Sequence, residues 1–162
     1  VRAAAQRHGP MHGVYYDPHL DVRESEGSGM AFRRLLKSGA AASLELHGYD
    51  PVVNSRAHTE WFLASDGRIA GDGRAHHRDP AFVSFDLDLL DAAHAPGVSA
   101  ANPSGWPPGP LLEAAERAGR DAAVRCIDVM ELSPPNDEQD RTARVAARLV
   151  LAFLRGFAER KT

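Results

Sequence analysis

The sequence lacks several features that would restrict its class. It contains one cysteine, Cys126, among 162 residues, so no intrachain disulfide can form and a reducing compartment is the simplest expectation. No apolar run approaches the roughly 20 residues of a membrane-spanning helix. Residues 1–13 also lack the apolar stretch of a signal peptide. We therefore expect a cytoplasmic protein with no membrane partner.

Neither sign of charge dominates the sequence. Nineteen Lys and Arg residues stand against 22 Asp and Glu residues, a formal net charge of −3. This positive charge is too small to hold a phosphate backbone by counterion release, so we expect no nucleic-acid partner. Aromatic residues make up only 7%, but the hydrophobic content of 43% suffices for one buried core. With no internal repeat or shift in composition, we expect a single domain over residues 1–162.

Apolar runs that favour strands alternate with helical patterns along the chain. The predicted strands are 13–17, 43–47, 81–86 with 87–91 carrying it to its end, and 124–130, with a brief strand near 67–70. The predicted helices are 1–8, 31–39, 59–64, 110–119 and 141–160, the last capped by Asp140. This alternation predicts a three-layer α/β/α fold around a mainly parallel sheet. Because the chain opens with Val1 in a helical pattern, we expect the N-terminal part of the fold to be missing.

Polar residues follow three of the predicted strands. They are Asp17-Pro18-His19-Leu20-Asp21, Asp86-Leu87-Asp88 and Glu131. Ligands of parallel sheets bind beyond the carboxyl ends of the strands, and alternate residues of an extended segment point to one side. Carboxylates and an imidazole gathered there would repel or compete unless cations were present, and such donors suit Mn²⁺, Mg²⁺ or Zn²⁺. Two neighbouring cations can activate water, which indicates a hydrolase.

Simpler interpretations remain open for each of these features alone. An Asp-x-His-x-Asp stretch fits a solvated turn, and Glu131 fits a capping residue. We expect His58, His76 and His77 to be surface residues. The long loop 95–109 is a candidate functional loop, and its Trp106 is either a packing residue or the wall of a pocket.

Several motifs together resemble one family. Phe82-Val-Ser-Phe-Asp-Leu-Asp-Leu-Leu-Asp91, followed by Ala95-Pro-Gly-Val-Ser99, resembles the signature of the arginase–agmatinase–formimidoylglutamase family, the binuclear manganese ureohydrolases. Asp17–Asp21 resembles an earlier motif of that family and Asp128-Val-Met-Glu-Leu-Ser-Pro134 a later one, in the same order. Within it the formimidoylglutamase branch, a histidine-degradation enzyme, is most similar, on Asp21-Val-Arg23, Ser28–Arg33 and Arg141–Arg144.

This resemblance implies an arginase-like fold, a homo-oligomer and two Mn²⁺ ions per site. It implies that Asp17 and Asp86 bridge the ions, that His19 and Asp88 bind one ion, and that Asp21 binds the other. Asp21 is also a candidate for passing a proton to the leaving nitrogen. The implied reaction hydrolyses N-formimidoyl-L-glutamate, a small molecule, to glutamate and formamide.

The resemblance also assigns two substrate-binding residues. Glu131 matches the position that holds the amidine or guanidinium group in the family. Arg23 stands where arginases carry Asn, and an arginine there can bind a substrate carboxylate through two hydrogen bonds. The alternative for Arg23 is a surface ion pair with Glu24 or Glu26.

The sequence departs from the family pattern at one metal ligand. The family's sixth ligand is a histidine in an upstream Gly-rich motif, and residues 1–16 contain no such motif. His8 and His12 are poor substitutes, because neither follows a strand. We therefore expect one metal position to lack a ligand. This leaves two alternatives open: another ureohydrolase, such as an agmatinase or guanidino-acid hydrolase, or a non-catalytic metal-binding protein of the same fold.

Overall fold

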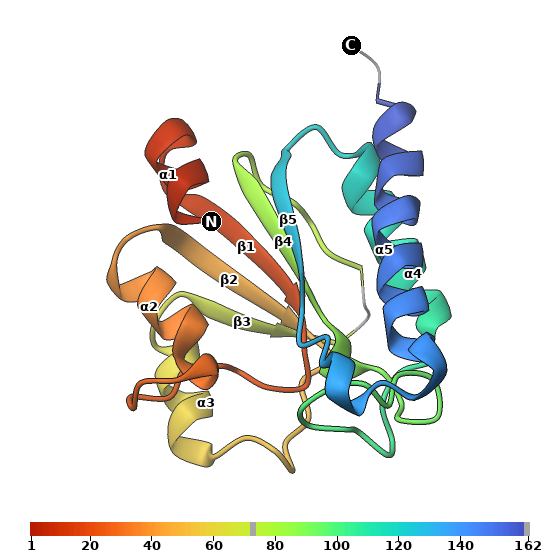
Figure 1. Ribbon diagram of the computed structural model, residues 1–162. Coiled ribbons are helices and arrows are strands. Elements are labelled where there is room, and N and C mark those ends of the chain that lie inside the picture. Colours follow the sequence, from red (N-terminus) through yellow and green to blue (C-terminus); the bar gives the residue numbers. More distant parts are fainter. Residues whose placement is uncertain (72–73, 161–162) are drawn as a thin grey trace.

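A computed structural model of the chain describes residues 1–71 and 74–160. Its centre is a five-stranded sheet in the order β3-β2-β1-β4-β5 (Figure 1). The strands are β1 (Met11–Tyr16), β2 (Ala41–His47), β3 (Gly67–Ala70), β4 (Ala81–Asp86) and β5 (Val124–Met130). Every pairing between them is parallel. The predicted parallel sheet is confirmed.

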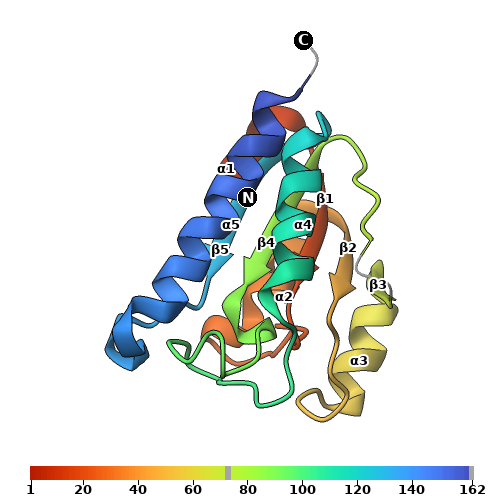
Figure 2. The same ribbon diagram turned by 90° about the vertical axis from the view of Figure 1, so that its right-hand side faces the viewer.

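Helices cover both faces of this sheet (Figures 1 and 2). One face carries α1 (Arg2–His8), α2 (Ala31–Lys37) and α3 (Arg56–Leu63), and the other carries α4 (Pro108–Arg120) and α5 (Arg141–Ala158). Successive side chains of β4 enter opposite cores: Phe82 packs with the α1–α3 side, whereas Val83 and Phe85 pack with the α4–α5 side. This continuous apolar strand therefore lies at the heart of a three-layer α/β/α fold.

Helices α4 and α5 approach each other at two glycines (Figure 2). A Cβ atom added at Gly119 would lie 2.1 Å from the carbonyl oxygen of Phe153, and one at Gly156 would lie 2.1 Å from that of Glu116. Such distances leave no room for a side chain. The pair thus forms a closely packed layer beneath the last two strands.

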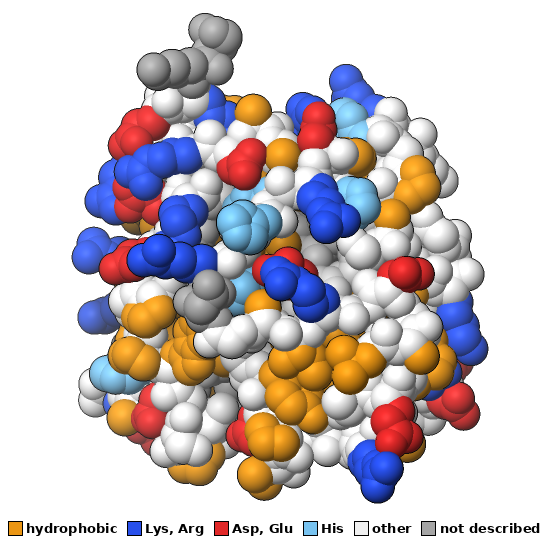
Figure 3. All heavy atoms as spheres, turned by 180° about the vertical axis from the view of Figure 1, so that it is seen from behind, with side chains coloured by type: hydrophobic (Ala, Val, Ile, Leu, Met, Phe, Trp, Pro, Cys, Tyr) orange, Lys and Arg blue, Asp and Glu red, His pale blue; other side chains and the backbone are white. Residues whose placement is uncertain are grey.

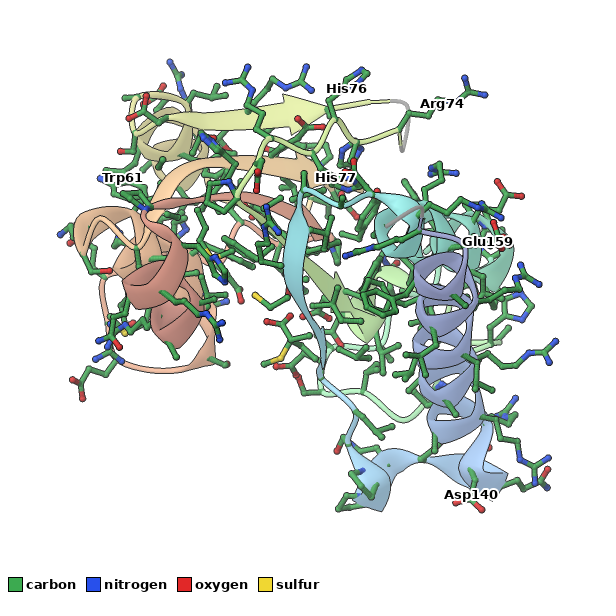
Figure 4. All side chains as sticks on the ribbon, turned by 90° about the horizontal axis from the view of Figure 1, so that it is seen from above. Trp61, Arg74, His76, His77, Asp140 and Glu159 are labelled. Atoms are coloured by element: carbon green, nitrogen blue, oxygen red, sulfur yellow. The ribbon has the colours of Figure 1, made fainter. Side chains whose placement is uncertain are left out.

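One predicted strand end and one predicted helix cap were wrong, each because of a local hydrogen bond. Residues Leu87–Leu89 form a 3-10 turn rather than the end of a strand, since the Asp86 carboxylate accepts the Asp88 N–H at 2.8 Å. Helix α5 is capped by Asp137, not Asp140: the Asp137 carboxylate accepts the N–H groups of the first turn at 2.9 Å. Asp140 and Glu159 mark the two ends of α5 in Figure 4.

The connection from β3 to β4 differs from the others. Its described residues, 71 and 74–80, contain no helix. Two histidines of this segment are labelled in Figure 4, and His77 was wrongly expected at the surface. Its side chain is 6% exposed and bonds Asp121 at 2.9 Å.

Over the described chain, no helix is long and apolar enough to cross a membrane.

Candidate metal centre

Three neighbouring strands deliver polar residues to one edge of the sheet. Asp17 follows β1, Asp86 ends β4, and Glu131 follows β5. Since parallel strands share a carboxyl edge, these residues converge although they are far apart in the chain. Asp86 and Glu131, though not Asp17, border a cavity of about 220 Å³ whose other lining residues are His19, Asp21, Arg23, Ser28, Gly29, Asp88, Ser99 and Ala100. The structure thus brings together the residues that the sequence predicted.

His19 lies between two of the carboxylates. Its Nδ1 atom is 3.2 Å from Asp17 Oδ1 and 4.0 Å from Asp88 Oδ2. The backbone N–H of His19 also donates to Asp17 Oδ1 at 2.6 Å. One imidazole is therefore held within reach of the carboxylates from β1 and from the turn after β4.

The carboxylates of this edge are buried with few compensating partners. Asp17, Asp86 and Asp88 are 2%, 7% and 4% exposed. The Asp86 carboxylate accepts the Asp88 N–H within the turn, and the Asp88 carboxylate accepts a long contact, 3.4 Å, from the Ala100 N–H. In the described chain, no Lys or Arg forms an ion pair with any of them. Burial without a cation is unfavourable for ionised carboxyl groups.

The acidities of these groups reflect that environment. Burial, with the charges of Asp17 and Asp88, raises the pKa of Asp86 to about 9. Burial and the charge of Asp21 raise the pKa of Asp17 well above its usual range. Burial also raises the pKa values of Asp21 and Asp88 to about 6. A divalent cation among these carboxylates would favour their charged forms and so oppose the effects of burial and of mutual repulsion.

The donor chemistry fits a hard or borderline divalent cation, because it combines carboxylates with one imidazole. In the geometry of the described residues, however, no group of three or more His, Cys, Asp or Glu side chains is arranged to hold a metal ion as it stands. The ligand roles of Asp17, His19, Asp21, Asp86 and Asp88 therefore stay predictions.

Asp21 and Glu131 share an unusual backbone conformation. Their φ angles are 50° and 67°, in the left-handed region that non-glycine residues rarely adopt. The carbonyl of Asp21 accepts the N–H groups of Phe32 and Arg33 at the start of α2, at 3.1 and 3.4 Å. The sequence predicted an extended segment over residues 17–21, but the left-handed conformation of Asp21 interrupts it. Residues held in this strained region cluster at functional sites.

Arg23 lines the cavity, and its side chain packs against Gly29. Its N–H donates to Gly29 O at 2.8 Å, and a Cβ atom at Gly29 would be 3.0 Å from Arg23 Cδ. In the described chain Arg23 forms neither of the alternative ion pairs, with Glu24 or with Glu26, and Glu24 pairs with Arg33 at 2.9 Å. The Arg33 guanidinium also lies 3.9 Å from the centre of the Trp61 ring. Arg23 is therefore left facing the cavity with Ser28 and Gly29.

Sequence reasoning missed one residue of the site. The Ser99 hydroxyl donates to Glu131 Oε2 at 2.6 Å. The signature motif contains Ser99, but the sequence alone offers no reason to pair it with a residue 32 positions away. Only its place in the long loop after β4 pointed to this edge of the sheet.

Comparison with known proteins gives consistent results. A formimidoylglutamase from Halalkalibacterium halodurans is 29% identical over 181 aligned residues, covering 96% of this chain and 56% of that protein. The crystal structure of Bacillus subtilis formimidoylglutamase matches with a TM-score of 0.90 and 28% identity, over 99% of this chain and 57% of that one. That of Trypanosoma cruzi formiminoglutamase with Mn²⁺ matches with a TM-score of 0.85 and 26% identity, over 94% and 58%.

These matches confirm the predicted arginase-like fold and show its extent. The chain spans little more than half the length of these relatives. The family model described as "Arginase family" matches residues 1–155, nearly the whole chain. The chain therefore belongs to the arginase family.

Proposed function

We propose that this chain supplies the metal-binding edge of a manganese-dependent amidine hydrolase. The reaction is N-formimidoyl-L-glutamate plus water to L-glutamate plus formamide, a step of histidine degradation. One observation carries the proposal: buried carboxylates without a Lys or Arg ion pair in the described chain surround a cavity that also presents Glu131 and Arg23. The names of the relatives support the substrate, and the Mn²⁺ of the T. cruzi protein supports the metal.

Five residues would hold the metal: Asp17, His19, Asp21, Asp86 and Asp88. Bound divalent cations supply Lewis acidity and make water acidic enough to react near neutral pH. Asp17 and Asp86, buried at the ends of the adjacent strands β1 and β4, would supply two of these carboxylates. His19, held 3.2 Å from Asp17, completes this side of the centre with a nitrogen donor.

Glu131 and Arg23 would orient the substrate. A carboxylate opposite a cationic amidinium fixes the reacting carbon for attack. Arg23 lines the same cavity, and its planar guanidinium suits a substrate that bears two carboxylates. Contacts at both ends of the substrate would hold its reacting carbon in one orientation.

Asp21 is suited to proton transfer as well as to metal binding. It lines the cavity together with Arg23, Asp86 and Asp88, so its carboxyl group is within reach of a bound substrate and can act as a general acid or base. In the proposed reaction its carboxyl group delivers the proton to the departing glutamate nitrogen.

The test is metal content after Mn²⁺ loading and desalting, followed by an assay of formamide release. We expect near-stoichiometric metal in the chain and none in an Asp86→Ala, Asp88→Ala double variant. Metal in neither protein would overturn the proposed centre. Urea release from agmatine or a guanidino acid, without formamide release, would assign the chain to another ureohydrolase. Bound metal with neither product would favour the non-catalytic alternative.

A further inference from the structure

We propose that Ser99 is a positioning residue that holds Glu131 against the wall of the cavity. This inference rests on the proposed function, in which Glu131 binds the amidinium group. The Ser99 hydroxyl donates to Glu131 Oε2 at 2.6 Å, and both residues line the cavity. A hydroxyl has one proton to donate, so Oε1 stays available for an N–H of the substrate.

Glu131 needs such a partner because of where it lies. It is the first residue after β5, and its φ of 67° turns the chain sharply out of the sheet. Over the described residues, no Lys or Arg pairs with its carboxylate, and Ser99 provides the side-chain hydrogen bond that orients it. A glutamate side chain loses considerable rotational freedom when it is fixed. Without Ser99, the substrate itself would have to order it.

The loop that carries Ser99 is anchored to the segment that follows Glu131. Three hydrogen bonds join them: Ser133 N–H to Gly97 O at 2.8 Å, Asn136 Nδ2 to Val98 O at 3.1 Å, and Gly97 N–H to Thr142 Oγ1 at 2.7 Å. Thr142 is fully buried. These bonds hold the backbone next to Ser99 in place independently of the contact between its side chain and Glu131.

Close packing reinforces the same anchor. A Cβ atom at Gly97 would lie 2.4 Å from Cβ of Asp137, the residue that caps α5. Only a glycine lets the loop approach this closely. The loop is thus fixed to the start of α5, a rigid element, rather than free over the cavity.

Two adjacent residues of this loop reach the two halves of the site. Ser99 bonds Glu131, while the N–H of Ala100 points to Asp88 Oδ1 at 3.4 Å. Asp88 is a predicted metal ligand and Glu131 the proposed amidinium ligand. The dipeptide therefore fixes the spacing between the group that holds the substrate and the group that holds the metal, a spacing that decides reactivity.

The experiment compares Ser99→Ala with Ser99→Thr in the Mn²⁺-loaded chain. Ser99 is exposed, so a threonine has room for its methyl group and retains the hydroxyl. The probe is acetamidinium, a small amidinium ion without carboxylates, and its dissociation constant is measured by NMR titration. Metal content is measured in parallel, and Glu131→Gln is the reference for loss of the amidinium ligand.

We expect Ser99→Ala to weaken acetamidinium binding about tenfold, as loss of a hydrogen bond to a charged group implies. Ser99→Thr should bind within about twofold of the parent, and all three variants should keep the metal content of the parent. Tight binding by Ser99→Ala, with weakened binding by Glu131→Gln, would overturn the role of Ser99 and leave the proposed function standing.

Other results distinguish failure of the Ser99 role from failure of the proposed function. Equal losses in Ser99→Ala and Ser99→Thr, or a loss of metal in Ser99→Ala, would show that Ser99 is merely structural and overturn the inference. Unchanged binding in Glu131→Gln, or no acetamidinium binding by the parent, would remove the amidinium role of Glu131. The proposed function would then fail at its substrate, and the inference with it.

Discussion

Two buried carboxylates of this sheet have opposite surroundings. Glu45, on β2, has a side chain 13% exposed and contacts both Arg68 and His47 at 2.7 Å. Asp86, on β4, is 7% exposed and faces Asp17 and Asp88 instead. The fold therefore neutralises a charge on β2 but concentrates charge of one sign at the end of β4. Uncompensated charge of this kind marks a place where a ligand, rather than the fold, supplies the counter-charge.

The surface follows the same division. Arg and His side chains gather near the middle of the face seen in Figure 3. The residues around Glu45, including His12, Arg68, His76 and Arg78, line a separate cavity of about 430 Å³. Two carboxylates and two arginines line this cavity, whereas four carboxylates and a single arginine, Arg23, line the cavity at the strand ends. The following predictions test whether this contrast is functional.

The largest effect is expected on metal affinity. Asp86→Ala should weaken Mn²⁺ binding by more than about 100-fold, because loss of groups that only support a ligand already costs 10–100-fold. Equilibrium dialysis with Mn²⁺ measures it. Glu45→Gln, which removes a carboxylate charge on β2, should leave the affinity within about twofold. Similar losses in both variants would break the comparison.

Replacement of the Asp86 carboxylate by an amide should stabilise the metal-free protein. The folded pKa of this group, about 9, lies above its unfolded value, so folding takes up a proton and stability is lost as pH rises from about 4 to 9. Asp86→Asn should raise the unfolding free energy at pH 8 by on the order of 3 kcal/mol, with little effect at pH 4. Urea denaturation with chelator present tests this, and a variant less stable at pH 8 would contradict it.

The same change at Glu45 should have the opposite sign. Glu45→Gln removes the charge that pairs with Arg68 and replaces the carboxylate that contacts the buried ring of His47, so we expect a loss of about 1–3 kcal/mol in unfolding free energy. The urea midpoint at pH 7 measures it. Arg68→Ala is the control: its side chain is 61% exposed, and its loss should cost less than that of Glu45.

The smallest effect is expected at an exposed pair. Arg56 and Glu60 lie one turn apart on α3, with side chains 92% and 64% exposed. Arg56→Ala should change the unfolding free energy by less than about 0.5 kcal/mol. A loss as large as that of Glu45→Gln in the same urea titration would show that burial does not separate these pairs.

Local pattern was sufficient for much of the fold and for the edge that carries the site. The apolar run of β4 is buried on both faces, and its end places Asp86 and Asp88 where the parallel topology requires. Likewise the residues after β1 and β5 reach the same cavity region. Short-range periodicity defines a strand end, and a parallel sheet makes the ends coincide.

The features that escaped prediction depend on distant partners. His77 is buried because Asp121, 44 residues away, accepts from its ring. Ser99 belongs to the site because Glu131 lies across the loop from it. No window of sequence contains these relationships, since each forms only when the chain has folded.

The left-handed backbone of Asp21 and Glu131 has a consequence for protein engineering. Glycine adopts this conformation without steric cost, so replacing either residue with glycine would relieve backbone strain of about 1 kcal/mol or more. A campaign that selects variants only for thermal tolerance would thus favour losing these two side chains. Both positions should be held constant in any such library, because heat resistance there would be gained at the expense of the chemistry.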